Sequence, residues 1–367
     1  MAVGILTQPL KTREQARDSR WREKFLGAPA GTQRPWLLDP TSEGISDTLS
    51  SNIYTILVDE LPVITHLILT GSRIDKNWFM IRDSSVKTER LMTLQPYDEQ
   101  CPIPVNSATR EALVELFQAL HHPYIYPVLD VDFANISSHT YVITVIPHNN
   151  KGSLKDLIYR QSHWQDDWGE KYQQRSTGLP VSQVQRLGRQ VLEALLFLQD
   201  RGFPPYGHLH SGNVVLQNGV ARLSGVENTL LGLTSRIYPI IKRRLRDNRD
   251  AIDSVCFGHV LFEMCAGYEL SAAHPTAKHL EDIAAYPQVV QVLEYIFGNG
   301  DQYPSIEEIL CIDFFRNLDL REMRAAPLPV RENLDLGIML CLLFLMCNFF
   351  EGLNLAVLVF ATKISTL

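Results

Sequence analysis

The sequence is poor in cysteine and has no excess of positive charge. Six cysteines are scattered over 367 residues, and no two of them have the CxxC spacing of a zinc or redox site. This pattern excludes a disulfide scaffold, predicts no metal site and is typical of reduced thiols in a cytoplasmic protein. Lysine and arginine number 34 against 41 aspartates and glutamates, a formal net charge of −7. Because a general nucleic-acid binder needs a cationic excess, nucleic acid is not a predicted partner.

Long apolar runs are missing from the first part of the chain and appear at its other end. Residues 1–45 are rich in Arg, Pro, Gly and Thr and predict a flexible arm without a secretory signal. From Leu336 the chain is uncharged up to Glu351, and a second apolar run ends at Ala361. The first run would span roughly 22 Å as a helix, less than the ~30 Å of a bilayer core, whereas both runs together are long enough. The tail, residues 327–367, is therefore a candidate membrane contact, with a buried helix or a terminus without a folded role as alternatives.

Apolar periodicity divides the remaining chain into two parts. Residues 46–150 carry strand-like runs separated by short turns, at 53–58, 65–69, 78–81, 90–94, 125–132 and 140–146. One helix is predicted in this part, capped by Asn106 or Ser107 and ending near Leu120. Residues 151–326 are predicted to be mainly helical. The fold class is therefore α+β, with a small β-rich lobe before a larger helical lobe.

Several start and stop signals locate elements in the second part. The signals are a Ser182–Gln185 capping box before a helix to Asp200, an Asn218-Gly219 hairpin turn, an apolar helix over 253–267 and a Ser305–Glu308 capping box. The helix over 253–267 is apolar on nearly every face, which predicts that it is buried.

Five local patterns resemble those of protein kinases, and they occur in the same order. They are a hinge strand with a GSL helix start (141–158), a catalytic loop (207–216, GHLHSGNVVL), the position of the metal-binding DFG (222–227), a buried helix (253–264, DSVCFGHVLFEM) and a closing helix (304–315). The resemblance implies the bilobal protein-kinase-like fold. It also implies structural roles for Asp253 and Gly258 in the buried helix.

Two stretches, 207–216 and 223–233, further resemble a family of kinase-like proteins that includes an insect potassium-channel-binding pseudokinase and a mammalian PX-domain pseudokinase. The resemblance implies a protein-binding scaffold that modulates a calcium-activated potassium channel and binds 14-3-3 proteins. It implies a cytoplasmic location, at the plasma membrane where the channel partner lies.

The catalytic positions that this resemblance defines are degenerate. The loop carries His208, His210 and Asn213, and the DFG position reads Gly225, Val226 and Glu227. An imidazole in place of the catalytic aspartate can accept a proton but supplies no fixed negative charge, and a glycine supplies no metal ligand. Asn213 is retained, either as a metal ligand or because its amide ties the loop to neighbouring backbone.

The first lobe lacks the residues that hold phosphates. No lysine occurs between Lys87 and Lys151, so Thr93 or Leu94 stands where the phosphate-binding lysine belongs. The helix glutamate that would pair with that lysine falls near Leu113, or at Glu111 after a register shift. One glycine occurs between residues 46 and 150, whereas a phosphate-binding loop needs several.

These losses predict a pseudokinase without catalytic residues and without a cofactor. The alternative is an atypical kinase that binds ATP and Mg²⁺ through Asn213 and Glu227 in a rearranged site. A basic run is a candidate docking patch for an acidic partner or a membrane surface, although such runs are usually solvated faces. The run comprises Lys242, Arg243, Arg244, Arg246 and Arg249.

Overall fold

The computed structural model describes most of the chain between residues 65 and 324. The described residues are 65–67, 76–83, 87–98, 101, 103–136, 139–161, 171–233, 235–245, 248–300 and 302–324. The predicted arm, the strand at 53–58, Arg246 and the apolar tail lie outside them.

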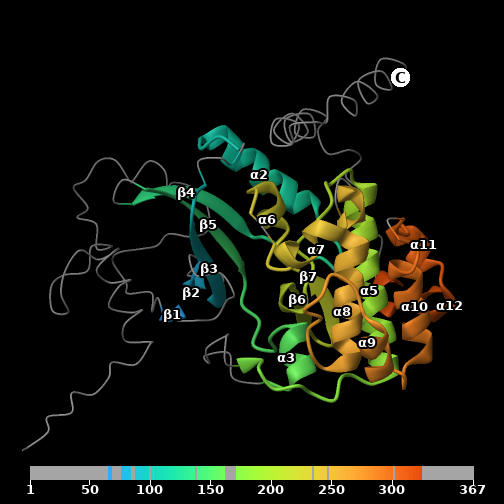
Figure 1. Cartoon of the computed structure of the whole chain (residues 1–367). Coiled ribbons are helices and arrows are strands. Elements are labelled where there is room, and N and C mark those ends of the chain that lie inside the picture. Colours follow the sequence, from blue (N-terminus) through green and yellow to red (C-terminus); the bar gives the residue numbers. More distant parts are fainter. Residues whose placement is uncertain are drawn as a thin grey trace, which may run out of the picture.

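The first lobe is a five-stranded antiparallel sheet with one helix (Figure 1). Its strands are β1 (Thr65–Leu67), β2 (Asn77–Asp83), β3 (Thr88–Pro96), β4 (Asp130–Ile136) and β5 (His139–Pro147), in the order β1-β2-β3-β5-β4. Four of the predicted strands within the described residues are confirmed. The strand predicted over 125–132 instead begins at Asp130.

The two faces of this sheet have different neighbours. Thr93 on β3 lies opposite Trp78 on β2 and Thr144 on β5, so these three side chains share a face. Trp78 packs into the main core that the sheet shares with the helical lobe. Leu94 belongs to a separate small cluster on the other face.

Helix α2 (Ser107–Ala119) is the helix of the first lobe. The Asn106 side chain caps it by accepting a hydrogen bond from the Thr109 N–H at 2.8 Å, as predicted. Arg110 ties α2 to β4 through ion pairs with Asp130 at 3.2 Å and Asp132 at 3.4 Å.

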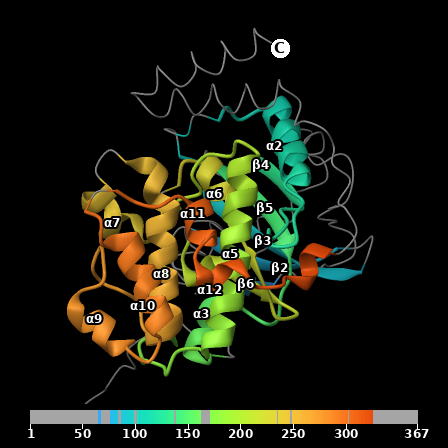
Figure 2. The same ribbon diagram turned by 90° about the vertical axis from the view of Figure 1, so that its right-hand side faces the viewer.

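The second lobe is helical, as the fold class predicts (Figure 2). Its helices are α3 (Leu154–Tyr159), α5 (Val181–Asp200), α6 (Val226–Leu230), α7 (Tyr238–Leu245), α8 (Ile252–Ala266), α9 (Ala277–Asp282), α10 (Pro287–Phe297), α11 (Ile306–Leu310) and α12 (Asp313–Arg316). Short 3-10 turns lie at Ser211–Asn213, Arg249–Ala251 and Arg321–Arg324. The predicted hairpin is confirmed as β6 (Val214–Gln217) and β7 (Val220–Leu223), with Asn218 and Gly219 at positive φ.

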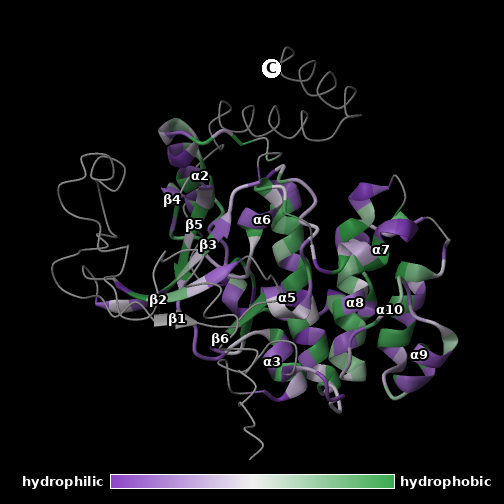
Figure 3. Cartoon of the chain, turned by 60° about the vertical axis from the view of Figure 1, so that its left-hand side comes forward, coloured by the Kyte–Doolittle hydropathy of each residue, from purple (hydrophilic) through white to green (hydrophobic). Residues whose placement is uncertain are grey.

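Helix α8 is the centre of this lobe. It lies between α5 and α10 and is hydrophobic along most of its length (Figure 3). Gly258 allows the contact with α10, because a Cβ at this position would lie 2.5 Å from Cε2 of Phe297. The predicted burial of this helix is confirmed.

One predicted capping box is present and the other is wrong. Ser305 and Glu308 cap α11 reciprocally. Helix α5 begins at Val181 after Pro180, so Ser182 lies inside the first turn and makes no cap. The Gln185 amide instead donates to the Phe314 carbonyl at 2.6 Å.

Backbone hydrogen bonds join the two lobes beside the hairpin. The Tyr126 N–H donates to the Leu223 carbonyl at 2.8 Å, and the Leu223 N–H donates to the Tyr124 carbonyl at 2.7 Å. Ile125 thereby forms a parallel bridge with Leu223 of β7. Among the described residues, no helix combines the length and the hydropathy that a membrane span requires.

Candidate functional site

Asp253 of α8 anchors the backbone of the segment that resembles a catalytic loop. Its Oδ2 accepts a hydrogen bond from the Tyr206 N–H at 2.8 Å, and its Oδ1 accepts one from the Gly207 N–H at 2.7 Å. Burial raises the pKa of this carboxyl to about 6, and the two backbone hydrogen bonds oppose that rise. Asp253 therefore fixes the backbone just before the position of the catalytic base.

His208 stands at the position of the base and is buried. Its carbonyl accepts a hydrogen bond from Nδ2 of Asn213 at 2.9 Å, and its ring meets the Tyr206 ring edge to face at 5.9 Å. Nδ2 of Asn213 therefore ties the loop to its own backbone. His210 also serves the loop, since its Nδ1 accepts from the Gly212 N–H at 3.1 Å and caps the turn at Ser211–Asn213.

Gly225, at the position of the metal-binding aspartate, is crowded by neighbouring side chains. Its φ of +83° is a left-handed conformation that favours glycine. A Cβ there would lie 2.6 Å from Nδ2 of Asn228 and 3.4 Å from Nδ2 of Asn213. Helix α6 begins directly after Gly225, and its first residue, Val226, is buried. The carboxylate that a kinase carries at this position is absent, and the neighbouring asparagine side chains pack closely around Gly225.

Glu227 on α6 is buried and pairs with a lysine that the kinase pattern does not predict. Its Oε1 lies 3.6 Å from Nζ of Lys76, and both side chains are less than a tenth exposed. Lys76 immediately precedes β2, and its ammonium lies 4.9 Å from the centre of the Trp78 ring. The kinase pattern places its lysine on the third strand. In the sequence, the indication of this pair is a lysine directly before an apolar strand.

At the kinase positions for the phosphate-binding lysine and its partner glutamate, the third strand carries no cation and α2 carries no buried acid. Thr93 occupies the face turned to the helical lobe, while Leu94 lies on the opposite face. Glu111 on α2 is exposed, and Leu113 is buried. An acid from α6, rather than from α2, therefore pairs with the lysine of this sheet. Helix α6 stands between the sheet and α8 in both views of Figures 1 and 2.

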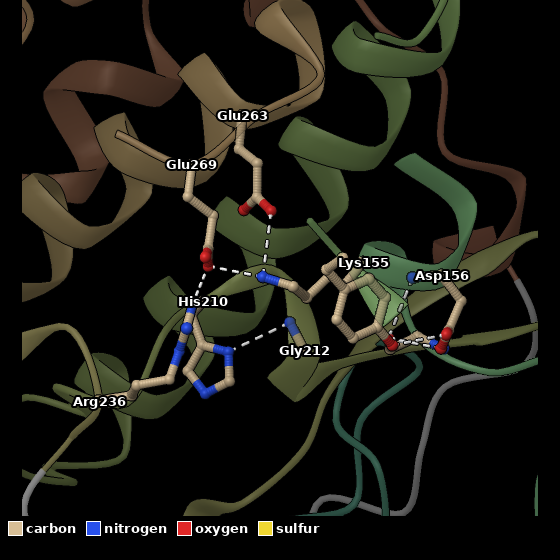
Figure 4. A network of polar contacts seen from close by, with 9 residues as sticks. Lys155, Asp156, His210, Gly212, Arg236, Glu263 and Glu269 are labelled. Atoms are coloured by element: carbon tan, nitrogen blue, oxygen red, sulfur yellow. Dashed lines mark hydrogen bonds and ion pairs between the residues drawn. The ribbon is translucent and has the colours of Figure 1, made fainter. Parts of the chain in front are cut away.

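A second polar network adjoins the loop (Figure 4). Lys155 of α3 is fully buried, with Nζ 2.7 Å from Oε1 of Glu269 and 3.7 Å from Oε1 of Glu263. Arg236 also pairs with Glu269. Burial lowers the pKa of Lys155 to about 8, against the opposing effect of Glu263. In the sequence, the indication of this network is a glutamate inside the apolar α8 segment, because a buried carboxylate needs a cation.

The residues of the basic run differ in exposure. The Arg244 guanidinium donates to the Phe297 carbonyl at 2.6 Å and to the Gly300 carbonyl at 3.2 Å, which ties α7 to the end of α10. Lys242, Arg243 and Arg249 are exposed. Within the described residues, the surface patch therefore consists of these three.

The kinase resemblance implies ATP held with Mg²⁺, and the residues present do not fit that group. Mg²⁺ is bound through carboxylates together with substrate phosphates. Position 225 carries no carboxylate, and Glu227 is paired with Lys76. In the part of the chain that the structure describes, no group of three His, Cys, Asp or Glu side chains could hold a metal ion.

Comparison with known proteins finds relatives among kinase-like proteins, although no family model matches the chain. Slowpoke-binding protein of Drosophila melanogaster is 52% identical over 275 residues, covering 71% of this chain and 53% of that protein. "Probable inactive serine/threonine-protein kinase slob2" of Dictyostelium discoideum is 35% identical over 293 residues, covering 75% and 47%. PX domain-containing protein kinase-like protein of Mus musculus is 39% identical over 201 residues, covering 54% and 33%. The chain thus spans between a third and about half of the length of these relatives.

Two solved structures are also similar. Rad53 1–466 in complex with AMP-PNP is 12% identical with a TM-score of 0.49, and the alignment covers 68% of this chain and 65% of that one. The PAN3 pseudokinase of Neurospora crassa is 13% identical with a TM-score of 0.46, and the alignment covers 64% and 55%.

Proposed function

The chain is related to slowpoke-binding protein and to PX domain-containing protein kinase-like protein, and from this kinship we propose that it is a pseudokinase. It acts as a kinase-shaped scaffold and regulator that binds proteins without transferring phosphate. By the same kinship, its partner is a calcium-activated potassium channel. It works without a cofactor.

The proposal that the chain transfers no phosphate rests on the crowded site at Gly225. A kinase needs an acid there to hold the metal that neutralises the phosphates. A Cβ at this position meets the Asn228 amide at 2.6 Å, so the loss involves the surrounding packing as well as one residue. The buried imidazole of His208 adds a second loss at the position of the base.

A radiolabel transfer assay tests this part of the proposal. The full chain is incubated with labelled ATP, Mg²⁺ and a mixed peptide substrate, beside Asn213→Ala and the surface control Lys278→Met. We expect all three proteins to give the same background. Transfer by the wild type and Lys278→Met that Asn213→Ala abolishes would establish the alternative, a kinase with a rearranged site.

Binding to the channel is tested with its isolated cytoplasmic domain. We expect saturable retention of the full chain, which supports the scaffold. The exposed basic patch is the proposed contact, so Lys242→Glu with Arg243→Glu should weaken retention at least tenfold, while Lys278→Glu on α9 should not. No retention above background would refute the channel as partner. Retention that is unchanged by the double reversal would refute the patch as its surface.

We further propose 14-3-3 proteins as partners and a cytoplasmic location beside the channel at the plasma membrane, as the resemblance of residues 207–216 and 223–233 implies. Recombinant 14-3-3 should retain the chain after phosphorylation and release it after phosphatase treatment. The tail from Leu336 to Ala361 is proposed as the membrane contact, and truncation after Asn333 should release the chain from carbonate-washed membranes. A full-length chain that never sediments with membranes would refute that contact.

A further inference from the structure

One ion pair connects the sheet to the segment that replaces the metal-binding motif. Lys76 precedes β2, Glu227 lies on α6, and Nζ and Oε1 are 3.6 Å apart. Both side chains are at least nine-tenths buried. A buried charge is costly without its counter-ion, so the geometry favours keeping the two elements together.

The pair lies where a kinase would handle phosphates. Glu227 is two residues after Gly225, the position of the metal-binding acid. The Lys76 ammonium lies over the Trp78 ring, and Trp78 is directly opposite Thr93, the residue on the helical-lobe side where the phosphate-binding lysine belongs. The cation and the acid of this region are both present, but they come from new positions and face each other.

A metal-bound triphosphate does not match this arrangement. Its phosphates need uncompensated positive charge, and the charge of Lys76 is already balanced by Glu227. The remaining candidate ligand, Asn213, offers a single neutral amide oxygen, since its Nδ2 holds the His208 carbonyl. Nucleotide binding would have to separate a buried ion pair and leave the Glu227 carboxylate beside the phosphates.

We propose that the Lys76–Glu227 pair is a built-in substitute for the nucleotide. In active kinases, the nucleotide and its metal bridge the two lobes; here a lysine and a glutamate of the chain itself make that bridge. The orientation of the sheet on the helical lobe is therefore set without ATP. This inference goes beyond the scaffold function and holds whichever protein the chain binds.

Thermal unfolding of the full chain tests the pair, with Lys76→Met, Glu227→Gln, the double variant and the exposed control Lys278→Met. Each single variant removes one partner of this buried ion pair and should lower the melting temperature by roughly 6–20 °C. The double variant should lose clearly less than the sum of the two, while Lys278→Met should change little. Single variants that melt like Lys278→Met would overturn the proposal.

Melting in the presence of ATP and amide hydrogen exchange provide the second readout. Millimolar ATP with Mg²⁺ should not raise the melting temperature of the wild type, because a ligand that does not bind the folded state cannot stabilise it. Amide exchange should become faster in both β2 and α6 in Lys76→Met, since each element loses its anchor. A rise in wild-type melting temperature with ATP that Lys76→Met abolishes would instead make Lys76 a nucleotide ligand and refute the substitution.

Discussion

Gly225 provides the sharpest test of the idea that the degenerate site is closed by packing. In Gly225→Ala, a residue at φ +83° pays the left-handed penalty of about 1–2 kcal/mol. Its Cβ also overlaps the Asn228 amide at 2.6 Å, and overpacking of a buried site costs about 1–3 kcal/mol. We therefore expect the free energy of unfolding to fall by about 2–5 kcal/mol in total.

The chain offers a matched control at Gly219. This glycine has φ +76°, and a Cβ added there meets nothing within 4 Å, so Gly219→Ala carries the backbone penalty alone, about 1–2 kcal/mol. Equilibrium urea unfolding of the two variants measures the difference, which is the cost of crowding at the site. Equal losses for Gly225→Ala and Gly219→Ala would refute the reasoning, because the Asn228 side chain would then give way without cost.

Three further perturbations test other contacts. Asp253 has its pKa raised to about 6 in the folded state from 3.8, so its contribution to stability is full below pH 3.8 and is lost as the pH rises through 6. Relative to Asp253→Asn, the wild type should gain about 2 kcal/mol between pH 7 and pH 4 in urea titrations. A constant difference across this range would contradict the raised pKa of Asp253. Lys155→Met leaves the Glu263 carboxylate buried with less compensation and should cost about 3–5 kcal/mol in the same assay, whereas exposed Lys278→Met should cost almost nothing. Ser305→Ala removes the cap of α11 and should cost about 1 kcal/mol, and no change in urea midpoint would show that the cap contributes nothing.

The sequence predicted elements best where local chemistry and burial agree. Helix α8 is apolar all round and ends before Gly267 at φ +70°, and both signals are visible in the sequence. The Ser182–Gln185 box has the same spacing as the Ser305–Glu308 box, yet it fails because the helix begins at Val181 and the Gln185 amide donates to the Phe314 carbonyl. Tertiary contacts decided that difference, and they are not readable from spacing.

The candidate site shows the same limit. His208, Asn213 and Gly225 were located by their order along the chain, since the kinase pattern fixes their separation. The kinase pattern does not predict Lys76 because it lies just before the second strand and not on the third, and its pairing with Glu227 spans about 150 residues. Such a pair is defined by how the sheet is placed on α6, and no local motif encodes it.

The hydrogen-bonded bridge at Leu223 changes what counts as a separable piece of this chain. Residues 124–126 form a parallel bridge with β7 of the hairpin, although they precede the connection at residue 150 that the sequence suggests as a boundary. A cut at that connection would remove these hydrogen bonds from Leu223, while the hairpin would keep its packing on α5 and α3. Main-chain hydrogen bonds therefore cross the expected boundary, and the second lobe produced alone should be less stable than in the full chain.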